Sequence, residues 1–441
     1  MNDTSLASSD ASVADAQKEF SPSEFKTVVT ASSIGTMVEW YDFTIYGTAS
    51  ALVFNKIFFP AIDPFLGTIA AFGSAAVGLF ARPFGGAIFG HFGDKLGRKN
   101  MLMATMMIMG IGTFCIGLLP DYNTIGIWAP ILLVILRILQ GIGIGGEWGG
   151  AALMVIESAP QKKRGFFGSF VQFGYPLGLL LSTIIFSLVS LLPEEQFLKW
   201  GWRIPFILSI ALVSLGMFIR SKVRESPVFA KAKAQKKLVK QPVIEVFKQH
   251  PKEFFSAIGL KASEVSWIYV LTIFIVAYVS NTLNLPKSVA LNGVLLGACL
   301  ELFTLPFFGW LSDKIGRRIL YITGAVASII CAYPLFILVG SGDSLTIMLA
   351  IALFMNICHA PMYGPQAAYF PELFGTSVRM SGASFGVQVA AAVFGGLSPI
   401  ICAVLLKVLD GSNGISVYLI SLAVVTLISA ILTRETKGEN L

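Results

Sequence analysis

Two acidic residues three positions apart in an apolar stretch are the clearest candidates for chemistry in this sequence. Glu39 and Asp42 both fall within the apolar run 27–54. Residues at this spacing share one face of a helix, so the two carboxyl groups are expected to be neighbours. Two carboxylates this close in a low dielectric repel each other, which favours a proton on one of them. The pair predicts a proton-binding site; the alternative is a structural pair bonded to an Arg or to Trp40.

Further ionisable residues lie inside other apolar runs. Lys261 and Glu264 repeat the same spacing, and they predict either a ligand contact or an ion pair confined to one helix. His359 titrates near neutral pH, so it predicts a proton relay or, alternatively, a hydrogen-bonded packing residue. Arg137 and Glu147 share the run 127–156. A charge facing lipid is costly, so each of these residues is expected to face water or a partner.

Charged clusters recur at matching places in the two halves of the chain. Residues 90–99 and 309–318 share the pattern Gly-x3-Asp-Lys-x-Gly-Arg-basic. Each is followed by a Glu and an Arg seven positions apart. A carboxylate can cap a helix and pair with Arg across a helix interface, and such contacts can break and reform when two halves move; the plainer alternative is a basic turn with a helix cap. The predicted gating residues are Asp94, Arg98, Glu157, Arg164, Asp313, Arg317, Glu372 and Arg379.

The composition shows which elements must position these residues. Of 441 residues, 55% are hydrophobic and 13% charged, against about 25% charged in soluble chains. These values exclude a disordered chain and a soluble nucleic-acid binder. Long apolar runs without alternation predict membrane-spanning helices rather than barrel strands. We expect twelve spans, at 27–54, 64–90, 101–120, 127–156, 165–192, 202–221, 254–281, 288–310, 319–340, 344–370, 380–407 and 414–433.

Loop charge predicts the orientation and the domain division. Of the 32 Lys and Arg residues, only five fall in the loops on one side: Lys56, Lys199, Arg203, Lys287 and Lys407. Basic loops stay in the cytoplasm, so both termini are expected inside. The predicted units are a cytoplasmic tail 1–26, a six-helix bundle 27–221, a basic linker 222–253, a second six-helix bundle 254–433 and a cytoplasmic tail 434–441. The linker is either a solvated tether or an amphipathic helix on anionic headgroups.

Short motifs that are typical of cofactor or metal sites in other proteins do not predict such sites here. Gly141, Gly143 and Gly146 spell GxGxxG, but no strand precedes them, so a dinucleotide site is rejected. The overlapping pair Gly141 and Gly145 instead predicts close helix packing. None of the five cysteines forms a CxxC pair, and no metal site, cofactor or catalytic residue is expected.

The duplicated loop motif resembles the signature of the major facilitator superfamily, and the likeness covers nearly the whole chain after residue 25. Within that superfamily the chain is similar to the metabolite:proton symporter family. The residues that carry this resemblance lie at 39–43 (EWYDF), 137–141 (RILQG), 145–150 (GGEWGG) and 200–206 (WGWRIPF). The resemblance implies an all-α polytopic fold of two six-helix repeats, with spans 1, 4, 7 and 10 lining a central cavity.

Residue types in those spans, together with polar neighbours in adjacent spans, predict the roles that follow. Proton coupling is expected from Glu39, Asp42 and His359. Arg137 and Lys261 are basic residues deep in the cavity-lining spans, one from each half, and either can bind a carboxylate. The expected substrate-binding residues are Arg137, Lys261, Glu264, Glu147, Trp40, Tyr41, Gln172, Tyr175, Asn356, Tyr363 and Gln388.

The expected function is import of a small organic acid with protons by alternating access, across the inner membrane of a bacterium. The resemblance favours a hydroxylated, shikimate-like acid; another mono-, di- or tricarboxylate is the alternative. The expected partners are the acid, protons and membrane lipid, with no nucleic acid. A transporter-like nutrient sensor is a rival from a different class. A channel lacks a visible selectivity element, and an enzyme lacks a nucleophile or metal motif.

Overall fold

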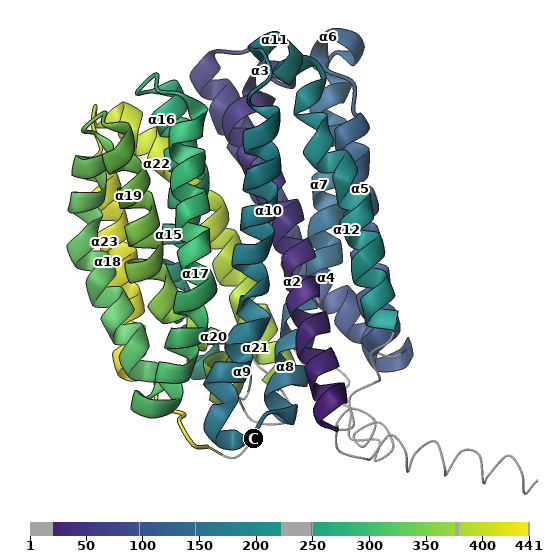
Figure 1. Cartoon of the computed structure of the whole chain (residues 1–441), viewed down its shortest axis with the longest axis vertical. Coiled ribbons are helices and arrows are strands. Elements are labelled where there is room, and N and C mark those ends of the chain that lie inside the picture. The colour runs from purple at the N-terminus through teal and green to yellow at the C-terminus, as the bar shows by residue number, and fades with distance from the viewer. Residues whose placement is uncertain are drawn as a thin grey trace, which may run out of the picture.

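The structure is a computed structural model that describes residues 21–96, 98–145, 147–221, 248, 250–374 and 379–439. Most of these residues are helical. The side chains of Asp94, Arg98 and Arg379 lie outside the described residues, as do most of the tail 1–26 and of the linker 222–253. The helices run roughly parallel to one long axis, and the described C-terminal segment lies at one end, here called the termini end (Figure 1).

The described residues of the N-terminal half form six long helical segments. In chain order they are α2 (Pro22–Ala49) continued by η1 (Ser50–Phe54) and α3 (Asn55–Ile57); α4 (Pro64–Leu96); α5 (Arg98–Leu118); α7 (Trp128–Ile144) with α8 (Glu147–Ser158); η2 (Gln161–Lys163) with α9 (Arg164–Gln172) and α10 (Gly174–Val189); and α11 (Glu194–Gln196) with η3 (Phe197–Gly201) and α12 (Arg203–Ser221). The short α6 (Tyr122–Ile125) connects α5 to α7.

The C-terminal half repeats this pattern beside it (Figure 1). Its segments are α15 (Pro251–Tyr269) with η4 (Val270–Phe274) and α16 (Ile275–Asn281); α17 (Lys287–Ile315); α18 (Arg317–Val339); α19 (Ser344–Phe354) with η5 (Met355–His359) and α20 (Ala360–Leu373); α21 (Arg379–Ala390) with η6 (Ala391–Gly396) and α22 (Leu397–Val408); and α23 (Asn413–Leu432). The segments η1, η3, η4, η5 and η6 are π-helical, a local widening that often occurs at functional sites.

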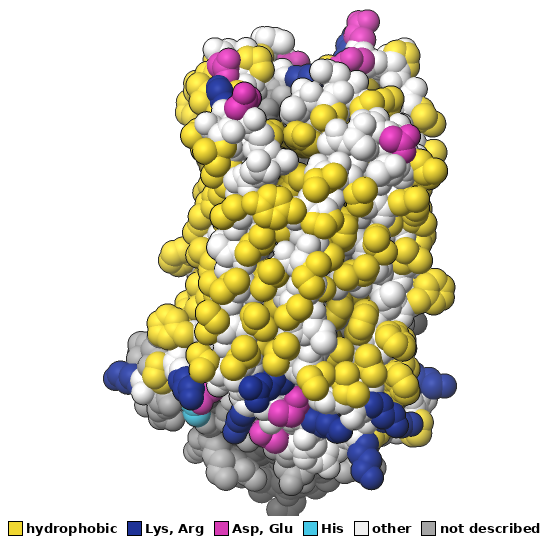
Figure 2. All heavy atoms as spheres, turned by 90° about the vertical axis from the view of Figure 1, so that its left-hand side faces the viewer, with side chains coloured by type: hydrophobic (Ala, Val, Ile, Leu, Met, Phe, Trp, Pro, Cys, Tyr) yellow, Lys and Arg dark blue, Asp and Glu magenta, His cyan; other side chains and the backbone are white. Residues whose placement is uncertain are grey.

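Ten helices among the described residues are long and apolar enough to cross a membrane. Figure 2 shows the matching band of apolar side chains, with Lys and Arg gathered at the termini end. The first predicted span is helical over Pro22–Ile57 but is less apolar, since it contains Glu39, Asp42 and several Ser and Thr residues. In the third, the apolar stretch Met103–Leu118 is shorter than the others. The predicted all-α polytopic fold is confirmed.

Polar caps fix helix ends at the rims of this band. The Ser21 hydroxyl accepts a hydrogen bond from the Glu24 N–H at 3.3 Å, and the Glu24 carboxylate accepts one from the Ser21 N–H at 2.8 Å, which is a capping box. The Asp343 side chain caps α19 by accepting a hydrogen bond from the Thr346 N–H at 2.8 Å. Hydrogen bonds from the hydroxyl and the N–H of Thr346 lower the pKa of Asp343.

Glycines bring α4 and α7 unusually close together. A Cβ atom on Gly141 would collide with the carbonyl of Gly78, and one on Gly145 with the carbonyl of Arg82. The close-packing interpretation of Gly141 and Gly145 is therefore confirmed. This contact matters for the site, because α4 carries Arg82 and α7 carries Arg137, two buried cations of the N-terminal half.

Candidate functional site

A buried ion pair stands at the centre of the N-terminal half. Arg82 Nη1 on α4 lies 3.3 Å from Glu39 Oε1 on α2, and their side chains are only 8% and 6% exposed. The guanidinium also lies over the Phe43 ring, 5.3 Å from its centroid. Arg82 was not among the predicted site residues, and its partner in the structure is Glu39. This geometry fits the alternative in which Glu39 is bonded to an Arg.

Asp42 lies in a different hydrogen-bonded chain. Its Oδ2 accepts a hydrogen bond from the Thr113 hydroxyl at 2.7 Å, and Thr113 in turn accepts one from Gln140 Nε2 at 2.6 Å. Arg137 Nη1 donates to Gln140 Oε1 at 3.2 Å. Asp42 Oδ1 is buried without a hydrogen-bond partner among the described residues. Asp42 thus has no direct cationic partner there, and an uncompensated buried charge is costly.

Arg137 is held against aromatic rings. Its guanidinium carbon lies 4.1 Å from the centroid of the Tyr46 ring and 5.2 Å from that of Phe43. Its Nε is buried and makes no hydrogen bond within the described part of the chain. Cation–π contact orients the guanidinium while leaving a donor unused. Arg137 therefore remains able to bind an additional acceptor.

The C-terminal half holds a denser cluster. Lys261 Nζ lies 2.5 Å from Glu264 Oε2 and donates to Gln366 Oε1 at 2.9 Å. His359 Nε2 lies 3.1 Å from Glu264 Oε1, and His359 Nδ1 lies 2.7 Å from Glu301 Oε1. The four ionisable side chains are at most 6% exposed. The structure thus unites the predicted Lys261, Glu264 and His359, and it adds Glu301 and Gln366.

A hydrogen-bonded chain links the two halves beside this cluster. The Trp148 indole donates to Gln172 Oε1 at 3.0 Å, and Gln172 Nε2 donates to Gln366 Oε1 at 3.2 Å. Aromatic rings continue the contact, since Tyr175 lies 5.4 Å from both His359 and Tyr363, and Trp40 lies 4.6 Å from Tyr175 between centroids. Of the residues predicted to bind substrate, Trp40, Gln172, Tyr175 and Tyr363 therefore meet at the boundary between the halves.

Other predicted binding residues lie apart from the central contacts. The Tyr41 hydroxyl donates to the Pro205 carbonyl at 2.6 Å, which directs it toward α12. Asn356 donates to two carbonyls, one of them that of Gly297 at 3.1 Å. Glu147 forms an ion pair with Arg220 of α12. Gln388 is buried, and its Oε1 lacks a partner among the described residues. None of the predicted binding residues is among those that line the cavity described next, and helical spacing alone could not separate the residues at the boundary between the halves from the others.

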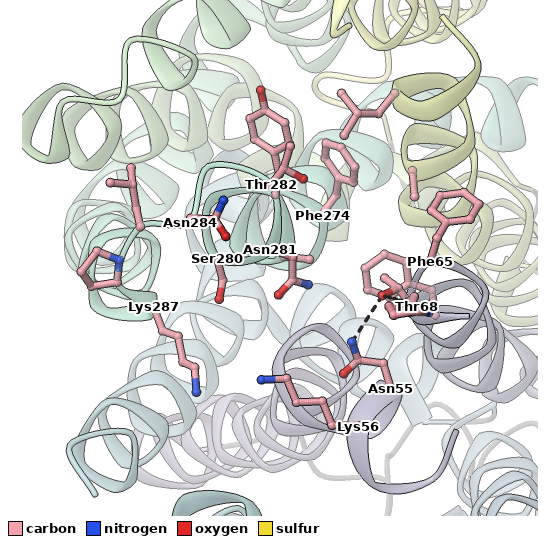
Figure 3. A pocket seen from close by; sticks show the side chains of 18 of the residues that line it. Asn55, Lys56, Phe65, Thr68, Phe274, Ser280, Asn281, Thr282, Asn284 and Lys287 are labelled. Carbon is pink, nitrogen blue, oxygen red and sulfur yellow. Dashed lines mark hydrogen bonds between the residues drawn. The ribbon is translucent and has the colours of Figure 1, made fainter. Parts of the chain in front are cut away.

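A cavity of about 1270 Å³ lies between the halves at the end opposite the termini (Figure 3). Its rim carries Lys56, Lys287 and Lys407, together with Glu194 and Asp410. Lys56 pairs with Glu194 at 2.6 Å. The other two lysines, from α17 and α22, reach aromatic rings of the opposite half instead: Lys287 lies 4.2 Å from the Phe197 centroid and Lys407 lies 3.9 Å from that of Phe65. Asn281, Asn284, Ser280 and Thr282 line the wall.

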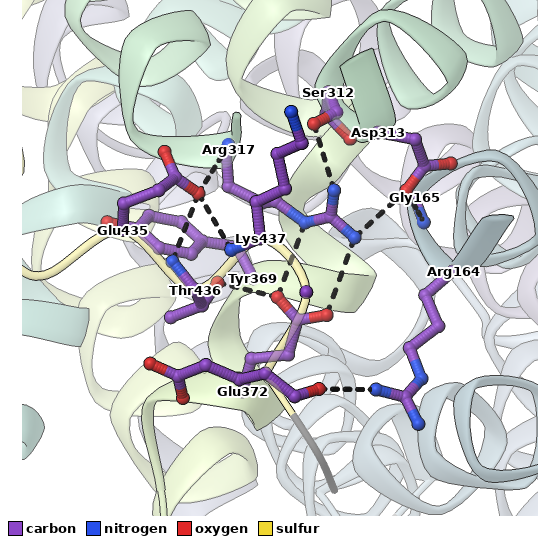
Figure 4. Close-up of polar contacts among 12 residues, drawn as sticks. Arg164, Gly165, Ser312, Asp313, Arg317, Tyr369, Glu372, Glu435, Thr436 and Lys437 are labelled. Carbon is purple, nitrogen blue, oxygen red and sulfur yellow. Dashed lines mark hydrogen bonds and ion pairs between the residues drawn. The ribbon is translucent and has the colours of Figure 1, made fainter. Parts of the chain in front are cut away.

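The termini end is closed by the predicted gating residues of the C-terminal half. Asp313 accepts hydrogen bonds from the backbone N–H groups of Gly165 and Phe166, both at 2.9 Å, so it caps α9 of the other half. Arg317 Nη2 lies 2.9 Å from Asp313 Oδ1, and its Nε lies 3.3 Å from Glu372 Oε2 (Figure 4). These contacts join α9, α17, α18 and α20 at one point.

The segment after α23 adds a second bridge across this end. The Glu435 carboxylate accepts hydrogen bonds from the N–H groups of Arg317 and Arg318 at 2.9 and 3.0 Å. Arg164 of the N-terminal half donates to the Glu439 carbonyl at 2.8 Å. Glu157 is half-buried at the end of α8. Within the described part of the chain, contacts between the halves therefore close the termini end, while the opposite end holds the cavity.

Known proteins with similar sequences cover more than nine tenths of the chain. A family described as sugar (and other) transporter matches residues 27–245 and 230–441. The shikimate transporter of Escherichia coli K12 is 44% identical, over 92% of this chain and 94% of its own length. The inner membrane metabolite transport protein YhjE of the same organism is 39% identical, over 98% and 99%. The proline/betaine transporter of Salmonella typhimurium is 36% identical, over 95% and 85%.

Solved structures share the fold at lower sequence identity. The proton:xylose symporter XylE bound to 6-bromo-6-deoxy-D-glucose superposes with a TM-score of 0.74 at 18% identity, covering 96% of this chain and 98% of that one. The inward open conformation of the Escherichia coli xylose transporter XylE gives a TM-score of 0.67 at 19% identity, covering 94% and 98%. At these identities the likeness concerns the fold.

Proposed function

The chain belongs to the sugar (and other) transporter family of the major facilitator superfamily, and from this premise we propose that it is a proton-coupled symporter that imports a small organic acid. Its relatives named above are transporters, so the prediction of a transporter rather than an enzyme is confirmed. The proposed location is the inner membrane, with both termini in the cytoplasm. The observation that carries the proposal is the pairing of buried cations with buried carboxylates on both sides of the boundary between the halves.

Cations with spare bonding capacity support an acidic substrate. Arg137 has an unused donor, and Lys261 shares its charge with Glu264 and with the neutral Gln366. A carboxylate is a natural acceptor for either side chain. Hydroxyl groups of the same molecule would find Gln172 and Tyr175, whose hydroxyl has no partner among the described residues. A hydroxylated acid of the shikimate type matches this combination, and the 44% identical relative is a shikimate transporter.

The difference between the two ends of the molecule, one with a cavity and one closed, supports alternating access. The cavity near Lys287 and Lys407 would admit substrate from the periplasm, whereas Asp313 and Arg317 hold the cytoplasmic end shut. Separation of α9 from α17 and closure of the cavity would reverse this arrangement. Breaking the Asp313 contacts and those of Arg164 with the C-terminal segment is the step that such a motion requires. The side chains Asp94, Arg98 and Arg379 are proposed to act in the same latch.

A proton site at Asp42 would supply the coupling. An ionised Asp42 is uncompensated by a neighbouring cation, since Thr113 and Gln140 separate it from Arg137. Protonation removes that cost, and the Thr113 hydroxyl can reorient to suit either form. Glu39, held by Arg82, is proposed to tune this site rather than to carry the proton itself.

Competition for uptake tests the substrate class. Purified protein in liposomes would be assayed with labelled shikimate against unlabelled shikimate, a di- and a tricarboxylate, proline and betaine. We expect shikimate and related hydroxy acids to compete most strongly, and proline and betaine weakly. Strong competition by a di- or tricarboxylate alone would indicate a different substrate within the class of organic acids. Competition by betaine alone would contradict the proposal, and binding without any uptake would favour a sensor.

A further inference from the structure

One histidine in the C-terminal half faces a carboxylate at each of its ring nitrogens. His359 Nδ1 is 2.7 Å from Glu301 Oε1, and its Nε2 is 3.1 Å from Glu264 Oε1. All three side chains are at most 1% exposed. The second oxygen of Glu301 is buried and has no hydrogen-bond partner among the described residues. Glu301 is thus a carboxyl whose only described polar partner is the imidazole.

Hydrogen-bond chemistry determines how many protons this arrangement holds. A neutral imidazole has one N–H donor and one lone pair, and an ionised carboxylate has acceptors only. With one proton, one ring nitrogen would point its lone pair at a carboxylate oxygen in a buried place, which is repulsive. Both short contacts become favourable only when two protons are shared by the three groups. One of them lies between Glu301 and Nδ1, and the other between Nε2 and Glu264.

Charge counting agrees with this number. With an ionised Lys261 and two shared protons, the four residues Lys261, Glu264, His359 and Glu301 are neutral together. Loss of one proton leaves a net negative charge away from water, which is costly. The cost falls when that region gains water or loses a nearby anion. The cluster can therefore hold a proton in one state of the protein and give it up in another.

The other described groups around His359 supply no positive charge that could take the place of this proton. Tyr175 of α10 and Tyr363 of α20 present their rings to the imidazole, at 5.4 and 4.7 Å between centroids. Tyr321 of α18 accepts a hydrogen bond from Gln366 at 3.3 Å, and Cys331 of α18 contacts Cys358. The sequence of α19 contains no ionisable residue. Lys261 is the cation nearest to this set, and Glu264 lies between it and His359.

We propose that Glu301, His359 and Glu264 form a second transported-proton site, separate from Asp42, so that two protons enter with each acid. This inference rests on the proposed symport. The step makes and breaks only N–H and O–H bonds: a proton from the periplasmic side joins the Glu301–His359 pair, and it leaves to the cytoplasm when the cluster opens there. An acid carboxylate that binds Lys261 competes with Glu264, and this links the proton to the substrate.

The net charge moved distinguishes one proton from two. A monoanion such as shikimate with one proton is electroneutral, whereas with two protons it carries one positive charge inward. In liposomes with equal pH on both sides and an interior-negative potassium diffusion potential, we expect wild-type protein to accumulate labelled shikimate. An electroneutral wild-type response would contradict the proposal while leaving the symport function intact. Absence of uptake driven by a pH gradient would instead sink the proposed function.

Glu301→Gln supplies the matched test. Glutamine can donate to Nδ1 while the neutral ring donates from Nε2 to Glu264, so the charge balance is kept with one proton fewer. We expect the potential-driven uptake to vanish, and the accumulation at a pH difference of about one unit to fall roughly tenfold, because one proton fewer contributes. Counterflow exchange, which moves no net proton, should remain measurable and reports that the variant is folded.

A second variant locates the two sites. Asp42→Asn should lower the number of protons transported with each shikimate by one, in the same way. The variant that carries both Glu301→Gln and Asp42→Asn should only equilibrate shikimate. A Glu301→Gln protein that keeps the wild-type response to potential would overturn the assignment to this cluster. If that variant does not fold, the charge moved by wild-type protein still decides between one proton and two.

Discussion

At the scale of residues, the sequence predicted which side chains carry charge in the core but not their partners. The spacing of Glu39 and Asp42 predicted one shared carboxyl site. In the structure, Glu39 instead forms an ion pair with Arg82 of α4, and Asp42 accepts a hydrogen bond from Thr113 of α5. Neighbours on one helix face still diverge when adjacent helices offer different partners, and those partners depend on tertiary packing. An apolar run containing Arg82 or Glu301 is a visible signal, although it does not reveal the contact.

Arg137 is the residue whose role in binding is most directly testable. Arg137→Gln removes a planar charged donor, and the loss of a charge-assisted hydrogen bond costs about 1.5–3 kcal/mol, or roughly ten- to a hundredfold in affinity. We expect that weakening for shikimate in a binding titration on purified, monodisperse protein. A neutral analogue without the carboxylate is the control, and its affinity should change little. Equal shikimate affinity in the variant and wild type would remove Arg137 from the site.

At the scale of elements, helix count and order followed from the sequence because long apolar runs and basic loops repeat in both halves. The π segments η4, η5 and η6 were not predicted, since an added residue in a helical turn leaves no mark on hydropathy. Their place matters, because η5 ends at His359. The glycine contact between α4 and α7 was predicted from spacing and is present.

Gly141→Ala tests that contact. The added Cβ would collide with the Gly78 carbonyl, which a backbone cannot avoid without moving α4 from α7. We expect a lower thermal unfolding temperature of the purified protein by several degrees, and weaker binding through displaced Arg82 and Arg137. Gly73→Ala in α4 is the matched control, because open space surrounds that position and alanine favours a helix. Equal unfolding temperatures for the two variants would contradict the interpretation.

The cap that Asp313 places on α9 predicts a defect in rate rather than in affinity. Asp313→Ala removes two hydrogen bonds from backbone N–H groups and the contact with Arg317. We expect an uptake rate roughly tenfold lower, because the state closed at the termini end loses charge-assisted bonds. Shikimate affinity should change less than twofold, since the latch is remote from Arg137 and Lys261. A large loss of affinity at an unchanged rate would argue against a latch.

The lysines of the cavity rim predict that shikimate uptake depends on salt concentration. Lys287 and Lys407 have no ion-pair partner among the described residues, so their charges can attract an anion. Neutralising both to Ala should lower uptake at low shikimate concentration about threefold in dilute buffer, and less as salt screens the charges. Lys199→Ala is the control, because this exposed lysine does not line the cavity. A defect independent of salt would point to a structural role.

At the scale of the whole molecule, each of two similar halves buries charged side chains. The duplicated loop motif predicted two comparable units, and the halves meet through Gln172 and Gln366 at the centre and through Asp313 at the termini end. Which end is open could not be predicted, since the same sequence serves every state of the cycle. Substrate identity was equally hidden, because it depends on the geometry of a few polar groups.

Uptake driven by a proton gradient alone tests proton-coupled transport most directly. Liposomes containing the purified protein would be given an inward pH gradient, with the membrane potential clamped at zero, and labelled shikimate would be followed inside. Proton-coupled symport predicts that shikimate accumulates transiently above its external concentration, and that a protonophore abolishes this accumulation. Entry that stops at the external concentration, with or without the gradient, would contradict proton-coupled transport by this protein.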